Sequence, residues 1–129
     1  MKPIWEDKDF FIEQEPHELP WIKLFCKTAY KELSDMPPPL RAHMWRIYDI
    51  AEETMRRYYN PEKINMASFG NMLPQVHIHI MARFKNDGYF PNPLWGERLR
   101  DTHPQLPSFD GFAEALRANL SRRLYKKEK

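Results

Sequence analysis

The most regular hydrophobic and polar pattern of the chain lies over residues 75–83, where the two kinds of side chain alternate without interruption. One set is Val76, Ile78, Ile80 and Ala82, and the other is Gln75, His77, His79, Met81 and Arg83. Because successive side chains of a strand point to opposite faces of its sheet, this pattern predicts a strand over Gln75–Arg83. Its polar face would carry both imidazoles, with their Cα atoms roughly 6.6 Å apart.

Three further segments have the composition of short strands. Phe10–Gln14 and Trp21–Lys27 flank turn-forming residues at 15–18, and together they predict a hairpin. Lys63–Phe69 precedes the pair Gly70 and Asn71, which turns the chain into the histidine strand.

Helical spacing begins after the prolines at 37–39, which are tolerated only in the first turn of a helix. Its apolar face consists of Leu40, Met44, Ile47, Tyr48, Ala51, Met55 and Tyr58. This spacing predicts a long helix that ends at Asn60 and Pro61. A last helix, capped by Ser108 or Asp110, would bury Phe112, Ala113, Leu116 and Leu120.

Residues 85–107 are rich in proline and include the turn signal Asn86–Gly88. We expect an irregular segment here. Long ordered loops are uncommon unless they have a function, so this segment is a candidate wall of a substrate site or a dimer contact. The order of the elements predicts an α+β fold with a mainly antiparallel sheet covered on one face.

Composition limits the class of protein. The chain has 129 residues, 42% of them hydrophobic and 29% charged, as expected for one soluble domain over residues 1–129. A net charge of +2 is too small to imply a nucleic-acid partner. Basic residues gather at the end of the chain, where we interpret them as a solvated tail: Arg117, Arg122, Arg123, Lys126, Lys127 and Lys129.

The cellular location is expected to be the cytoplasm. The single cysteine, Cys26, excludes an internal disulfide framework and is compatible with a reducing compartment. No apolar run approaches the ~20 residues that span a membrane, and the first residues have no signal-peptide core.

The histidine pair allows three interpretations. The two side chains are solvated histidines on an amphipathic strand, or they bind a metal ion, or one is a nucleophile toward a phosphate. A catalytic zinc site usually takes three protein ligands, and no carboxylate follows His79 before Asp87.

A resemblance favours the phosphate chemistry. Gly70–Arg83 resembles the signature of the histidine triad (HIT) superfamily of nucleotide hydrolases and transferases, His-x-His-x-His with apolar x, with Gln75 in the first position. Phe84–Asp87, Phe90–Gly96 and, upstream, Leu19–Phe25 resemble the corresponding segments of bacterial members. The similarity covers roughly residues 10–100.

The resemblance implies a HIT-like fold, with a sheet of about five strands, a long central helix and a C-terminal helix. It also implies a homodimer whose sheets join across the interface, and an enzyme that acts at the α-phosphate of a purine nucleotide or nucleoside phosphate. The expected substrates are nucleoside phosphoramidates or dinucleoside polyphosphates. No cofactor and no metal ion is expected.

Roles follow from the matched positions. His77 would attack phosphorus and form a covalent nucleotidyl-histidine, its second nitrogen donating to the backbone carbonyl of Gln75. His79 and Gln75 would hold phosphoryl oxygens. Substrate contacts are assigned to Asn71, Asn65, Trp95 and Arg83. For Arg83 the sequence also allows a purely structural pairing with a surface carboxylate.

Two departures from the family pattern change the expected chemistry. Gln75 replaces the first histidine, and an amide cannot carry a proton charge near neutral pH. Met72 stands where many members have a serine or threonine that hydrogen-bonds the leaving group. A nucleotide-binding protein with little turnover therefore remains an alternative, as does a metal-dependent hydrolase.

Overall fold

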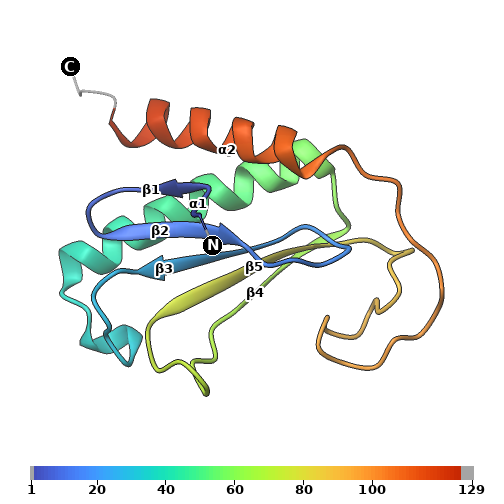
Figure 1. The fold of residues 1–129 in the computed structure, drawn as a ribbon, viewed down its shortest axis with the longest axis horizontal. Helices are drawn as coiled ribbons and strands as arrows, with labels where there is room; N and C mark the ends of the chain where they lie inside the picture. Colours follow the sequence, from blue (N-terminus) through green and yellow to red (C-terminus); the bar gives the residue numbers. More distant parts are fainter. Residues whose placement is uncertain (1, 126–129) are drawn as a thin grey trace.

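The computed structural model describes residues 2–125, which form a five-stranded antiparallel sheet with two helices on one face (Figure 1). The strand order is β1-β2-β3-β5-β4. The elements are β1 (Trp5–Glu6), β2 (Phe10–Gln14), β3 (Trp21–Cys26), a short 3-10 turn (Leu33–Asp35), α1 (Pro38–Tyr59), β4 (Lys63–Ala67), β5 (His77–Arg83) and α2 (Phe109–Leu124). This α+β arrangement confirms the predicted fold class.

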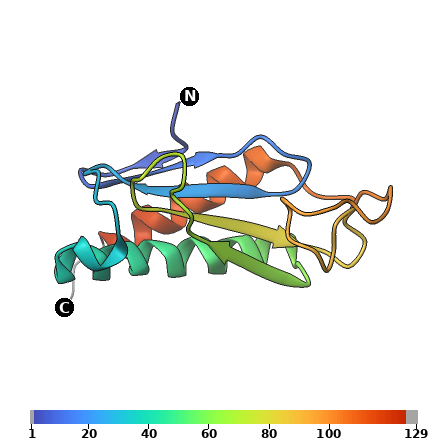
Figure 2. The same ribbon diagram turned by 90° about the horizontal axis from the view of Figure 1, so that it is seen from below.

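The sheet contains the predicted hairpin and lies with one face against the helices. β2 and β3 form the expected antiparallel hairpin, and β5 lies between β3 and β4. In Figure 2, α1 lies below the strands and α2 runs diagonally behind them. The helix layer covers the apolar set of β5, where Ile78, Ile80 and Ala82 are buried. The histidines therefore lie on the opposite face, which we call the open face.

Both helices begin and end where the local chemistry requires it. Pro38 and Pro39 occupy the first turn of α1, and the helix ends at Asn60, whose φ of 49° is left-handed. Ser108 caps α2, its hydroxyl oxygen accepting from the Gly111 N–H. A Cβ on Gly111 would clash with the Tyr58 hydroxyl, so a larger residue there would displace the Tyr58 side chain.

The prediction of a strand from Gln75 to Arg83 was two residues too long. The Gln75 N–H bonds to the Leu73 carbonyl in a turn, and the Val76 N–H bonds to the Tyr30 carbonyl. The regular ladder to β3 therefore begins only at His77, which lies opposite Phe25. The prediction also missed β1, because two residues are too short for an alternation to be recognised.

Residues 84–108 contain no helix or strand, as predicted, yet they are well ordered by hydrogen bonds around Asp87. This segment lies at one end of the sheet (Figure 1). Met81 and Arg83 share the parity of the histidines but are each 1% exposed. The polar face predicted for β5 is therefore covered at this end of the strand.

In the described part of the chain, neither helix is both long and apolar enough to cross a membrane. Arg117, Arg122 and Arg123 lie on α2, whereas Lys126, Lys127 and Lys129 of the predicted basic tail lie outside the described residues.

Candidate active site

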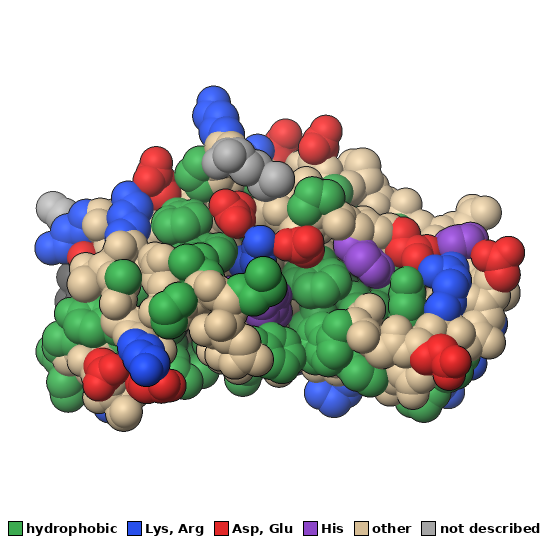
Figure 3. Space-filling view, turned by 60° about the horizontal axis from the view of Figure 1, so that its bottom comes forward, with side chains coloured by type: hydrophobic (Ala, Val, Ile, Leu, Met, Phe, Trp, Pro, Cys, Tyr) green, Lys and Arg blue, Asp and Glu red, His purple; other side chains and the backbone are tan. Residues whose placement is uncertain are grey.

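The two histidines of β5 lie side by side on the open face, with ring centroids 5.1 Å apart. β3 supplies their nearest neighbours, because Lys23 lies opposite His79 and Phe25 opposite His77 in the antiparallel register. Figure 3 shows histidine in a hollow framed by hydrophobic side chains, with acidic and basic side chains beside it. The pair is thus brought together as the alternation predicts.

His77 is held in one orientation and one tautomer. Its Nδ1 lies 2.8 Å from the Gln75 carbonyl oxygen, which can only accept, so Nδ1 carries the proton in the neutral ring. The ring stacks on Phe25 at 4.8 Å with an interplanar angle of 14°, and His77 is 8% exposed. Among residues 2–125 nothing hydrogen-bonds Nε2, so its lone pair is available for attack.

His79 has the opposite tautomer. The Trp21 indole N–H, which can only donate, lies 3.0 Å from Nδ1 of His79. The proton of the neutral ring is therefore on Nε2. Burial, together with the nearby His77 and Lys23, lowers the pKa of His79 to about 4. Near neutral pH this residue is an uncharged hydrogen-bond donor.

Lys23 is the cation beside the pair, and carboxylates already neutralise it. Its Nζ lies 2.8 Å from Glu15 and 3.4 Å from Glu13, and 5.7 Å from the centroid of the Phe25 ring. Burial alone would lower the pKa of Lys23, but the hydrogen bond and charge of Glu15, with those of Glu13, raise it. The lysine is therefore charged near neutral pH.

Gln75 and Asn71 lie before β5. The Gln75 side-chain amide donates to the Cys26 carbonyl at 2.7 Å, which joins the start of the histidine strand to the end of β3. Its backbone carbonyl orients His77, as the resemblance implies. Asn71 is exposed in the turn after Gly70, whose φ of +69° is left-handed. Met72, next to it, is 99% exposed.

Arg83 forms part of a buried cluster. Its guanidinium makes two hydrogen bonds to Asp87, of 3.0 and 3.1 Å, and a third of 2.8 Å to the Asn65 side-chain oxygen. Asp87 is fully buried and also accepts three backbone N–H groups. Of the two roles that the sequence leaves open for Arg83, the geometry favours the structural one, but the expectation of a surface carboxylate was wrong because Asp87 is buried. Asn65 is committed to the same cluster.

Aromatic side chains surround His79. Trp21 and Phe69 lie 5.8 and 5.9 Å from its ring, and Trp95 lies 4.8 Å from Phe69 and 6.3 Å from Trp21. Trp95 comes from the irregular segment after β5 and is 50% exposed. The segment thus supplies a wall near the histidines, as one of the two expectations for it states.

Sequence reasoning missed three side chains that shape this site: Trp21, Phe25 and Phe69. The signal was present for the first two, because Trp21, Lys23 and Phe25 alternate along a predicted strand just as the histidines do. The strand order decides which strand lies beside the histidines, and this order cannot be predicted from the alternation of side chains.

The remaining histidines are engaged elsewhere. His43 lies 2.8 Å from Asp7, His103 lies 2.5 Å from Glu18, and His17 Nδ1 accepts from the Leu19 N–H. Across residues 2–125, no three His, Cys, Asp or Glu side chains gather in a geometry that could hold a metal ion.

Comparison with known proteins supports the fold described above. The family model of the HIT domain matches residues 6–86, more than half of the chain. None of the curated proteins matches the sequence.

Solved structures extend the likeness to nearly the whole chain. A histidine triad protein from Bradyrhizobium japonicum has 23% identity and a TM-score of 0.76, over 92% of this chain and 89% of that one. One from Sinorhizobium meliloti has 26% identity and a TM-score of 0.71, over 92% and 88%. A zinc-bound histidine triad family protein from Mycobacterium smegmatis has 20% identity and a TM-score of 0.57, over 93% and 84%.

Proposed function

This chain belongs to the HIT-domain family, and on that basis we propose that it is a nucleotide hydrolase or transferase acting at the α-phosphate through a covalent nucleotidyl-histidine at His77. The proposed substrates are purine nucleoside phosphoramidates or dinucleoside polyphosphates.

One observation carries this proposal: the 2.8 Å hydrogen bond between His77 Nδ1 and the Gln75 carbonyl oxygen. A neutral imidazole attacks through one nitrogen and must keep its proton on the other. The Gln75 carbonyl holds that proton on Nδ1, so the Nε2 lone pair is ready. The backbone makes this contact, and the change from histidine to Gln75 therefore preserves it.

The reaction proceeds in two displacements. The Nε2 lone pair of His77 forms a bond to the α-phosphorus, while the bond from phosphorus to the leaving group breaks and its electron pair departs with that group, which takes up a proton from solvent when it is an amine. Water or another acceptor then attacks the same phosphorus and loses a proton to solvent, and the bond to Nε2 breaks with its electron pair returning to the imidazole. His79 donates its Nε2–H to a phosphoryl oxygen during both steps, which stabilises the charge that develops there.

Substrate contacts are proposed for the groups around the pair. Asn71 lies in the exposed turn before β5, where its amide can reach a phosphate or a leaving group. Trp95 presents a half-exposed ring, against which a purine can stack. Asn65 and Arg83 act indirectly in this proposal, by fixing the segment that carries Trp95.

The test is a panel of purine nucleoside phosphoramidates and dinucleoside polyphosphates, assayed for release of nucleoside monophosphate with and without exhaustive chelation. We expect release from at least one phosphoramidate, unchanged by chelator. No release from any substrate would contradict the proposal. Activity that is lost on chelation and restored by zinc would favour the metal-dependent hydrolase instead.

A second candidate, a nucleotide-binding protein with little turnover, is supported by the Gln75 side chain. Its amide is bound to the Cys26 carbonyl and supplies no titrating proton. Calorimetry with a purine nucleoside monophosphate separates the two candidates, because tight binding without release of product from any substrate favours the second.

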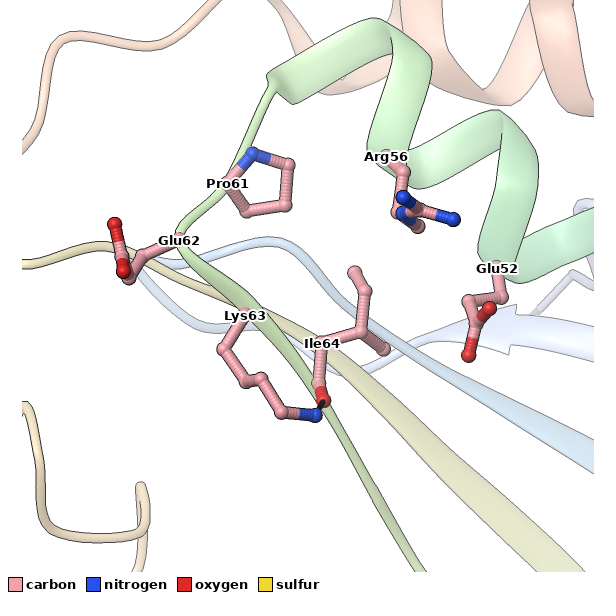
Figure 4. A pocket seen from close by; sticks show the side chains of 6 residues that line it. All are labelled: Glu52, Arg56, Pro61, Glu62, Lys63 and Ile64. Carbon is pink, nitrogen blue, oxygen red and sulfur yellow. Dashed lines mark hydrogen bonds between the residues drawn. The ribbon is translucent and has the colours of Figure 1, made fainter.

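We further propose a homodimer formed along β4. This strand is the last in the sheet order, and within residues 2–125 its outer edge has no partner strand. Met66 and Phe69 on and after it are 46% and 51% exposed. Figure 4 shows the cleft beside this edge, of about 340 Å³, in which Arg56 and Glu52 of α1 face Ile64.

Light scattering tests the dimer. We expect a molar mass of two chains for the wild type and of one chain for Met66→Glu, because a charge on an edge strand opposes pairing. A wild-type protein that is monomeric at all concentrations would contradict it.

A further inference from the structure

The indole N–H of Trp21 has one acceptor, the Nδ1 atom of His79, at 3.0 Å. The two residues lie 58 positions apart in the sequence and meet because β3 pairs with β5. Trp21 is opposite Met81 in the register, so its indole reaches diagonally along the open face to the histidine.

From this contact we infer that Trp21 is a positioning residue: its N–H fixes His79 in the tautomer with the proton on Nε2, so that His79 meets a phosphate as a neutral donor. The inference rests on the proposed function for the identity of the ligand. The tautomer itself is a property of the protein alone.

The physical reason is the direction of the hydrogen bond. An indole nitrogen has a proton and no acceptor lone pair, so Nδ1 of His79 must present its lone pair. Protonation of Nδ1 would place two N–H groups against each other. Loss of the N–H therefore makes both the other tautomer and the imidazolium more accessible.

The charged and titratable groups around His79 act in different directions. His77 on β5 and Lys23 on β3 lower the pKa of His79, whereas Glu15 after β2 raises it, and burial is the largest cause of the decrease. Glu13 of β2 lies across Lys23 and partly neutralises it. Phe69 and Trp95 add no charge. Among these neighbours Trp21 is the one that hydrogen-bonds a particular nitrogen of the His79 ring, and this contact selects the tautomer.

Trp21→Phe tests the inference, since it keeps an aromatic ring and removes the N–H. The control is Trp45→Phe on α1, whose ring packs on Tyr48 in the helix layer. Nitrogen-15 NMR of the histidine rings reports the tautomer without any substrate. For wild type and control we expect an unprotonated Nδ1 and a protonated Nε2 on His79. For Trp21→Phe we expect a mixture of tautomers and a pKa higher by about one unit.

Function gives the second readout. Titration with adenosine monophosphate should show weaker binding by Trp21→Phe, by about fivefold to tenfold, as expected for loss of one oriented hydrogen bond. A wild-type tautomer and pKa of His79 in Trp21→Phe would overturn the inference, whatever the activity. A third outcome is that the tautomer changes as expected but the protein neither binds nor cleaves nucleotides. Trp21 would then still control the tautomer of His79, but its role in phosphate binding and the proposed function would both be overturned.

Discussion

Two polar clusters lie on the same face of β5. One keeps hydrogen-bonding groups available for a ligand, whereas the groups of the other are paired with each other. At one end, the His77 ring keeps Nε2 available and His79 keeps an Nε2–H to donate. At the other end, the Arg83 guanidinium and the Asp87 carboxylate satisfy each other, with Asn65 and backbone groups completing the set. In the sequence, His77, His79 and Arg83 belong to the same set of alternating residues of one strand.

The difference follows from what covers each end. Asp87 organises the segment after β5, and the Phe90 ring of this segment lies 5.7 Å from the Arg83 guanidinium. A buried charge needs a partner, because leaving it unpaired costs several kcal/mol. The histidines lie where coverage ends and can remain neutral, so they need no ionic partner. A cluster with unused hydrogen-bonding capacity can receive a ligand, whereas a satisfied one holds the structure.

The comparison predicts its largest effect at His77. His77→Ala should reduce turnover by about three orders of magnitude or more, because it removes the nucleophile, and the variant should still fold. His103→Ala, on the surface beside Glu18, is the matched control and should retain activity. Turnover of His77→Ala within about tenfold of the wild type would end the covalent proposal.

Asp87→Ala should have the opposite profile. It leaves the buried Arg83 charge without its carboxylate, and we expect the free energy of unfolding to fall by about 3–5 kcal/mol. Asp101→Ala, whose side chain is 95% exposed, should change it by less than about 0.5 kcal/mol. Chemical denaturation measures both. An Asp87 variant as stable as the wild type would show that the buried cluster is not structural.

The two clusters should lose stability in different pH windows. The pKa of His79 is lower in the folded chain than its ordinary value of 6.5, so the unfolded chain binds the extra proton and stability falls as pH decreases from 6.5 to about 4. Burial alone would raise the pKa of Asp87, but the hydrogen bonds from Arg83 and from backbone N–H groups lower it from 3.8. Its contribution is therefore lost as pH falls below that value.

His79→Gln separates these windows. Urea unfolding across the pH range should show that the stability of this variant depends less on pH between 6.5 and about 4 than that of the wild type. The loss of stability below pH 3.8 should be the same in both proteins. Equal slopes for variant and wild type between pH 6.5 and 4 would mean that His79 is not held neutral by the fold.

Gln75→Ala should have the smallest effect. If the backbone carbonyl alone orients His77, the variant should lose less than about tenfold in kcat/KM, and Gln75→His should be tolerated. Steady-state kinetics decides this. Inactivity equal to that of His77→Ala would give the amide side chain a chemical role.

The alternation at residues 75–83 was sufficient to predict the strand, the histidine pair and the buried side of the sheet. Helix boundaries followed from Pro38, Asn60 and Ser108, because capping depends on neighbouring residues. The burial of Arg83 and the Trp21 contact could not be predicted, since each depends on a partner that the fold brings from another element. The start of β5 at His77 likewise depends on the Tyr30 carbonyl, which lies far away in the sequence.

The most direct test of the central claim is intact-mass spectrometry of the protein quenched during turnover of a purine nucleoside phosphoramidate, at neutral to alkaline pH because a phosphorus–imidazole bond is labile to acid. We predict an increase equal to one nucleotidyl group, located by fragmentation on the peptide that contains His77, present in His103→Ala and absent from His77→Ala. Turnover with the adduct on another residue, or with adduct formation undiminished in His77→Ala, would contradict the account.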